Sequence, residues 1–164
     1  MSQYIQFYIK GIESFYPIAT FSRSNLIYEM FRDEGGVPFE KLIPITNKQL
    51  GWVCDGCRNR IEAVNKTITN YKEKIARIDK WDAPISDKID AIDTYKEYIE
   101  EEEETLRELE TVRGFAAFLY GMIEEADGTK YENDIETLNP NTYVWAGIEV
   151  GYPNIEDYEG IEEK

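Results

Sequence analysis

The sequence predicts an α+β fold: a small antiparallel or mixed β-sheet with a long antiparallel two-helix coiled-coil hairpin inserted before the last strand. Residues 4–10 alternate apolar and polar side chains, a period of two that is typical of a strand. Residues 46–127 hold two long series of apolar side chains at helical spacing, which predict paired helices. The strand alternation returns in residues 143–150. We therefore expect a head in residues 1–45, the hairpin in 46–127, and a return strand with an acidic, aromatic tail in 128–164.

The first 21 residues predict a β-hairpin. The alternation in residues 4–10 predicts one buried and one exposed face, with Ile5, Phe7 and Ile9 on the first and Gln6, Tyr8 and Lys10 on the second. Residues 15–21 are expected to form the second strand. Pro17 indicates that this strand lies at an edge of the sheet, because proline has no N–H to donate.

A short helix is expected to follow the hairpin. Ser22 or Ser24 is the predicted N-cap, and Gly35-Gly36 is the predicted end. The apolar residues of this helix are Leu26, Ile27, Met30 and Phe31. Residues 37–45 contain two prolines, which indicates an extended connection or a short strand.

The first long helix has the clearest pattern in the chain. Thr46 to Gln49 fits a capping box, in which residues three apart cap each other's backbone N–H groups. The pattern predicts a helix of about 33 residues, or roughly 50 Å, which Asp82-Ala83-Pro84 ends. Its apolar positions alternate steps of four and three: Leu50, Cys54, Cys57, Ile61, Val64, Ile68, Tyr71, Ile75 and Ile78.

A second long helix is predicted from a cap at Ser86 to an end at Asp127-Gly128. Its apolar series has similar spacing with an interruption at Glu102-Glu103: Ile89, Ile92, Tyr95, Ile99, Leu106, Leu109, Val112, Ala116, Leu119 and Ile123. Folding the two helices together about Ala83-Pro84 predicts four opposed pairs: Ile78 with Ile89, Ile75 with Ile92, Ile68 with Ile99, and Ile61 with Leu106.

The charge of the chain is strongly asymmetric. The formal net charge is −15, yet residues 1–82 carry twelve Lys/Arg against ten Asp/Glu, whereas residues 83–164 carry six against twenty-three. Such asymmetry indicates a partner more than a reaction. Because nucleic acids and anionic membranes are themselves negative, we expect no direct binding to either. A basic protein surface is the natural complement.

Composition excludes several functional classes. Histidine is absent, which excludes Ser-His-Asp and Cys-His catalysis, and no phosphate-binding glycine loop, dinucleotide motif or calcium loop occurs. We expect that the protein is not an enzyme and that it has no catalytic residue, cofactor or bound metal. No run of eighteen apolar residues occurs, and the first residues are too polar and too few for a signal peptide. We therefore expect a cytoplasmic protein, and the inhibitor hypothesis given below implies a bacterial host cell.

Cys54 and Cys57 form a Cys-x-x-Cys motif, the one motif in the sequence that resembles a reactive or metal-binding site. The interpretation we favour is that both pack on the apolar seam of the first long helix. A zinc site would need two further ligands, and so a dimer that shares four thiolates. Redox chemistry is the third alternative, although redox pairs lie at a helix N-terminus and Cys54 is about two turns inside the helix.

The second long helix contains the candidate partner-binding residues. Eleven acids between Asp87 and Glu110 give one negative charge per roughly 3.2 Å of helix, or about 4.3 Å after cations are subtracted, and one DNA strand carries one per about 3.4 Å. The ordinary alternative is a solvated helix face. We expect contact on the side that faces away from the first helix, through Asp90, Asp93, Glu97, Glu100, Glu101, Glu104 and Glu108.

The C-terminal segment mixes aromatic rings with carboxylates. Either Tyr143 or Trp145 is expected to pack onto the sheet, and the remaining rings to contact an arginine-containing surface, since guanidinium groups stack on rings and pair with carboxylates. The candidate residues here are Tyr143, Trp145, Glu149, Tyr152, Glu156, Asp157 and Tyr158.

These observations predict a non-enzymatic inhibitor or regulator that occupies the nucleic-acid site of a basic protein or nuclease as a DNA mimic. Its mechanism would parallel that of acidic anti-restriction and anti-CRISPR proteins of bacteriophages; the parallel is one of mechanism and not of motif. One alternative is a structural coiled-coil adaptor or homo-oligomer whose charge serves solubility, and another is a thiol-redox protein. The sequence does not fix the oligomeric state and allows a homodimer.

Overall fold

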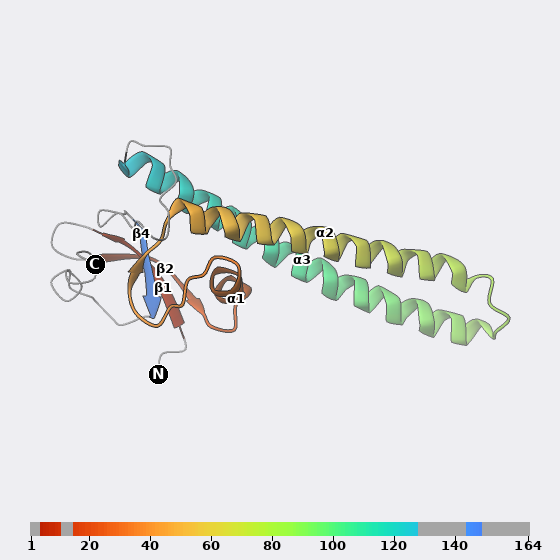
Figure 1. The fold of residues 1–164 in the computed structure, drawn as a ribbon. Coiled ribbons are helices and arrows are strands. Elements are labelled where there is room, and N and C mark those ends of the chain that lie inside the picture. The colour runs from red at the N-terminus through yellow and green to blue at the C-terminus, as the bar shows by residue number, and fades with distance from the viewer. Residues whose placement is uncertain (1–3, 11–14, 128–143, 149–164) are drawn as a thin grey trace. The chain divides into compact units, whose positions relative to one another are not determined.

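The computed structural model describes residues 4–10, 15–127 and 144–148. The chain divides into two compact units, one made of residues 1–56 with 112–164 and the other of residues 57–111. The fold is α+β, with a four-stranded antiparallel sheet and long helices that pack against each other (Figure 1). The long helices are α2 (Asn47–Ile78) and α3 (Ile85–Asp127), and each contributes residues to both units.

The sheet of the first unit confirms the predicted strands. Strands β1 (Tyr4–Lys10), β2 (Phe15–Ser22), β3 (Ile43–Pro44) and β4 (Val144–Ile148) pair in the order β2-β1-β4-β3. All neighbours are antiparallel, and the β1–β2 register shifts between Phe7 and Tyr8. Strand β2 lies at an edge, as Pro17 predicts. The other edge is β3, in the segment expected to be an extended connection or a short strand.

Aromatic rings fill the core on one face of the sheet. The ring of Phe7 lies 5.2 Å from Phe31, 6.0 Å from Phe39, 5.0 Å from Phe115 and 6.0 Å from Phe21, in edge-to-face geometry throughout. Phe31 belongs to α1 (Leu26–Asp33) and Phe115 to α3. The central strand therefore holds together two helices and a neighbouring strand through one side chain.

The opposite face of β1 corrects the expectation of an exposed polar face. Tyr8 is fully buried and Gln6 nearly so. Tyr8 packs in a cluster with Phe15, Leu42 and Trp145. The physical reason is that β1 is a central strand with a packed layer on each side, and a tyrosine ring supplies an apolar body to such a layer. The period-two pattern correctly predicts the strand but wrongly predicts that its second face is exposed.

The cap of α1 also differs from the prediction. Asn25 is the N-cap, and its Oδ1 accepts a hydrogen bond of 2.9 Å from the Ile27 N–H. The predicted caps, Ser22 and Ser24, lie too far upstream and are hydrogen-bonded to each other through their Oγ atoms at 2.9 Å. Asn25 has the extended backbone that an N-cap requires and directly precedes the first helical residue.

The predicted capping box at the start of α2 is confirmed. The Gln49 N–H donates to Thr46 Oγ1 at 3.1 Å, and the Thr46 N–H donates to Gln49 Oε1 at 3.0 Å. Helix α2 is 32 residues long, close to the predicted length. At the start of α3 the prediction of a Ser86 cap is wrong, because the Lys88 N–H bonds to the Pro84 carbonyl at 3.2 Å and Ser86 lies inside the first turn.

In the unit of residues 57–111, α2 and α3 pack side by side (Figure 1). The ring of Tyr71 lies 5.8 Å from Tyr95 and 5.6 Å from Tyr98. These contacts agree with an antiparallel pairing of Ile68 with Ile99, and both isoleucines are buried. Ile89 corrects the predicted pairing with Ile78: Ile78 is fully buried, but Ile89 is 51% exposed, because α2 ends at Ile78 and offers no further helical turn for Ile89 to pack against.

Close packing of β4 makes Gly147 sensitive to substitution. A Cβ added there would lie 2.9 Å from Leu42 Cα and 3.1 Å from Leu42 N, which are backbone atoms. We expect Gly147→Ala to lower the free energy of unfolding by about 1–3 kcal/mol through overpacking, as measured by urea denaturation. Gly51→Ala is the matched control, since nothing lies within 4 Å of its added Cβ. Equal stability of both variants would contradict this packing.

Candidate functional site

Seven exposed carboxylates form a continuous surface on α3, here called the acidic stripe. At 100° per residue they fall within a sector of about 100°, and every position of that sector between Asp90 and Glu108 is acidic. The stripe is about 27 Å long at 1.5 Å per residue. Its members are Asp90, Asp93, Glu97, Glu100, Glu101, Glu104 and Glu108, all of them exposed. The structure thus brings together all the α3 residues that the sequence analysis selected.

The opposite face of α3 fixes the direction of the stripe. Ile99 and Leu109 are buried. Glu97 and Glu104 lie about 160° and 140° around the helix from Ile99. Glutamate has good intrinsic helix propensity, so the run from Glu100 to Glu104 favours a helix without help from packing. The stripe is therefore held outward by the burial of the other face.

Few cations offset the charge of the stripe. Arg107 Nη2 lies 3.3 Å from Glu104 Oε2, and both side chains are mostly exposed. An exposed pair of this kind contributes little energy and competes weakly with a partner. Lys96 and Arg107 lie about 240° and 260° around α3 from Asp90, outside the acidic sector. The stripe therefore presents an almost uniform negative surface.

Four stripe residues line a shallow, open hollow of about 430 Å³: Glu97, Glu100, Glu101 and Glu104. Carboxylate oxygens accept charge-assisted hydrogen bonds, and two neighbouring carboxylates suit the fork of donors on a guanidinium group. The hollow lacks any nucleophile or base other than these carboxylates. It is suited to receive a lysine or arginine side chain of another protein.

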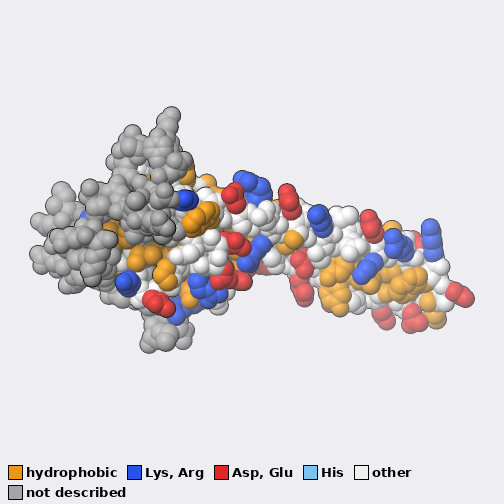
Figure 2. Space-filling view, viewed as in Figure 1, with side chains coloured by type: hydrophobic (Ala, Val, Ile, Leu, Met, Phe, Trp, Pro, Cys, Tyr) orange, Lys and Arg blue, Asp and Glu red, His pale blue; other side chains and the backbone are white. Residues whose placement is uncertain are grey.

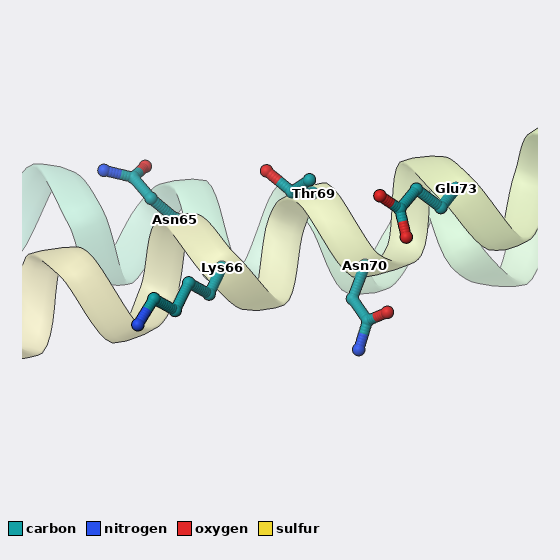
Figure 3. A pocket seen from close by; sticks show the side chains of 5 residues that line it. All are labelled: Asn65, Lys66, Thr69, Asn70 and Glu73. Atoms are coloured by element: carbon teal, nitrogen blue, oxygen red, sulfur yellow. The ribbon is translucent and has the colours of Figure 1, made fainter.

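A second hollow, on α2, was missed by the sequence analysis. It has a volume of about 300 Å³ and is lined by Asn65, Lys66, Thr69, Asn70 and Glu73. Figure 3 shows that these side chains diverge, with Asn65 and Thr69 on one side and Lys66 and Asn70 on the other. They do not converge on a point where a ligand atom could sit. No sequence signal would have marked this hollow, because its residues are ordinary for an exposed helix face.

The C-terminal candidates divide into one buried residue and several outside the described residues. Trp145 is fully buried, and its ring lies 5.1 Å from Phe15. This burial confirms the expectation that one of Tyr143 and Trp145 packs onto the sheet, and it corrects the inclusion of Trp145 among the partner-contacting residues. The other candidates lie outside the described residues: Tyr143, Glu149, Tyr152, Glu156, Asp157 and Tyr158.

The two cysteines of α2 differ in exposure. Cys57 is fully buried and Cys54 is half-buried. Within residues 4–10, 15–127 and 144–148, no group of three or more His, Cys, Asp or Glu side chains is arranged to hold a metal ion. Burial of Cys57 supports the packing interpretation, while the shared zinc site and the redox pair stay hypotheses.

No protein-family model, curated protein or solved structure matches this chain. Among the helices that the structure describes, none is long and apolar enough to cross a membrane.

Proposed function

We propose that the protein is a non-enzymatic inhibitor or regulator that binds the basic surface of a nucleic-acid-binding protein or nuclease. The acidic stripe would lie where the phosphates of DNA lie in the functional complex of the target, as in anti-restriction or anti-CRISPR inhibition. The single observation that supports this is the set of seven exposed carboxylates that share one sector of α3.

The spacing of the stripe supports mimicry of a phosphate backbone. Seven charges over about 27 Å are separated on average by about 4.5 Å along the helix, against about 3.4 Å along one DNA strand. A groove lined with lysine and arginine for phosphates therefore meets a similar charge density on α3. The mimic needs no bases, because phosphate contacts supply most of the nonspecific affinity of DNA-binding proteins.

Rigidity of the stripe is part of the proposal. We propose that residues 57–111 form an antiparallel coiled-coil hairpin inserted between β3 and β4. The buried pair Ile68 and Ile99 and the tyrosine contacts across the helices support this. A paired helix keeps its charges in fixed positions, so that binding costs less conformational entropy than it would for a disordered acidic segment.

A competition experiment tests the proposed function. The protein is titrated into complexes of a fluorescent DNA duplex with each member of a panel of purified restriction endonucleases and RNA-guided nucleases. We expect release of the duplex from at least one enzyme, read as a fall in fluorescence anisotropy. The release should weaken between about 0.05 and 0.2 M salt, as charge pairs are screened. Retention of the duplex by every enzyme would contradict the proposal.

The thiol alternative has its own test. We expect Cys54→Ala/Cys57→Ala to inhibit a sensitive nuclease as well as the wild type does, because neither thiol belongs to the acidic stripe. The free energy of unfolding should fall by about 1–2 kcal/mol, since a buried sulfur is removed at position 57. Inhibition curves and urea denaturation of the double variant provide both values. Loss of inhibition with the stability intact would favour the thiol-dependent function instead.

A further inference from the structure

Exposed apolar side chains gather at the end of the helical pair where α2 passes into α3. Ile85 is 75% exposed, Ile89 51% and Trp81 46%. Ile85 and Ile89 are four residues apart on one helix and so lie on the same face. Figure 2 shows hydrophobic side chains gathered at this end, with acidic and basic side chains interspersed among them. These three residues, Trp81, Ile85 and Ile89, are here called the tip surface.

The composition of the tip surface is unusual for a turn between helices. Single exposed apolar residues are common, but a tryptophan and two isoleucines that are all exposed within nine residues indicate an interface. The turn itself is already closed by its own hydrogen bonds. The Trp81 N–H donates to the Ile78 carbonyl at 3.0 Å, and Lys88 Nζ donates to the Asp79 carbonyl at 3.2 Å. Closing the turn therefore does not require the apolar side chains.

The charge around the tip surface indicates what covers it. Residues 71–90 contain five Lys/Arg and five Asp/Glu, so this end is neutral, whereas residues 91–111 contain two Lys/Arg against nine Asp/Glu. A basic partner would be drawn to the acidic stripe, whereas the balanced charges around the tip surface neither attract nor repel it. A two-fold contact places the same patch on both copies. Two copies that meet at their tips can therefore pair the lysines of one copy with the carboxylates of the other.

We propose that the tip surface is the contact through which two copies of this chain associate. It is the neutral, apolar end of a helical pair in a chain whose net charge is −15, and so a place where two copies can meet with little repulsion. The acidic stripe begins at Asp90, directly after Ile89, and extends about 27 Å away from the tip, so most of its charges on one copy lie farther from those on the other than the screening length of about 8 Å at physiological salt. The association does not depend on the proposed inhibitory function, but it would present two stripes in one assembly and raise avidity for an extended partner.

The contact is small, so the dimer is expected to be weak. Three apolar side chains from each copy form a core smaller than that of a standard interface of about 1,600 Å². We expect a dissociation constant of roughly 10–100 μM. Because burial of apolar surface drives the association, it should persist at about 0.5 M salt, in contrast to binding through the stripe.

Sedimentation velocity of the full chain tests the proposal, over concentrations from about 5 to 500 μM that bracket the expected constant. We expect the mean mass of the wild type to rise from monomer to dimer. Ile85→Ser/Ile89→Ser should weaken the association by at least about tenfold. Phe118→Ser, which removes another exposed apolar side chain of α3, is the matched control and should associate as the wild type does. Circular dichroism melts verify that both variants are folded.

Three outcomes would overturn the proposal: a monomeric wild type at every concentration, undiminished association of Ile85→Ser/Ile89→Ser, or an equal loss in the Phe118→Ser control. A further measurement separates the tip from the target. If the wild type is monomeric and the isoleucine variant instead loses affinity for a sensitive nuclease, the tip surface contacts the target and not a second copy. Self-association with no inhibition of any nuclease would uphold this proposal and contradict only the proposed function.

Discussion

Conversion of all seven stripe carboxylates to amides should abolish inhibition of a sensitive nuclease while the protein stays folded. The stripe variant replaces each Asp by Asn and each Glu by Gln at positions 90, 93, 97, 100, 101, 104 and 108. We expect the affinity for the target to fall by about 10³-fold, which corresponds to about 4 kcal/mol. Each amide keeps the shape of the carboxylate but loses its charge and its charge-assisted hydrogen bonds.

The same change should not destabilise the helix. Several stripe residues repel each other at helical spacing, among them Asp93 with Glu97, Glu97 with Glu101, and Glu100 with Glu104. Each such like-charge pair costs about 0.2–0.5 kcal/mol, so we expect the stripe variant to be at least as stable as the wild type. Urea denaturation provides this value. If both the affinity and the stability fell, unfolding would account for the loss of binding, and the electrostatic explanation would fail.

A matched control distinguishes the effect of the acidic stripe on binding from the effect of the net charge. Seven other exposed acids can be converted in the same way: Glu40, Asp55, Glu62, Glu73, Asp79, Asp82 and Asp87. The stripe variant and this control both change the net charge from −15 to −8. We expect the control to keep most of the inhibition. Equal losses in the two variants would mean that net charge and not the stripe drives binding.

The largest loss of stability is expected for Phe7→Ala. Four other phenylalanine rings lie within 6.0 Å of the Phe7 ring centroid, and Phe7 is fully buried. Truncation leaves a cavity between the sheet and two helices and should lower the free energy of unfolding by about 3–5 kcal/mol. Phe118→Ala, at a site 58% exposed, should cost much less. Chemical denaturation measures both, and a loss below about 1 kcal/mol for Phe7→Ala would contradict this core.

The sequence predicted best where local chemistry decides the structure. The capping box of Thr46 and Gln49, the break at Pro84 and the edge strand with Pro17 depend on backbone hydrogen bonds that neighbouring residues determine. The cap of α1 was missed because Ser22, Ser24 and Asn25 are all competent caps within four positions. Only the exact start of the helix distinguishes Asn25 from the others.

Burial by distant segments was not accessible from local pattern. Tyr8 has a polar hydroxyl and lies on the face that alternation marks as exposed, yet residues from β2, β4 and the segment before β3 cover it. The acidic neighbours of Trp145 in the sequence indicate a partner contact, but its place in the same cluster depends on strand pairing across more than 130 residues. The acidic stripe was predictable because a long helix fixes which residues share a face.

The most direct test of the proposed function is a binding-order experiment with a nuclease that the protein inhibits. The apparent dissociation constant of the enzyme for a DNA duplex is measured at a series of protein concentrations. Occupation of the DNA site by the stripe predicts that this constant rises in proportion to protein concentration without limit, and that no ternary complex forms. A constant that reaches a plateau, with DNA and protein bound to the enzyme together, would contradict mimicry of DNA.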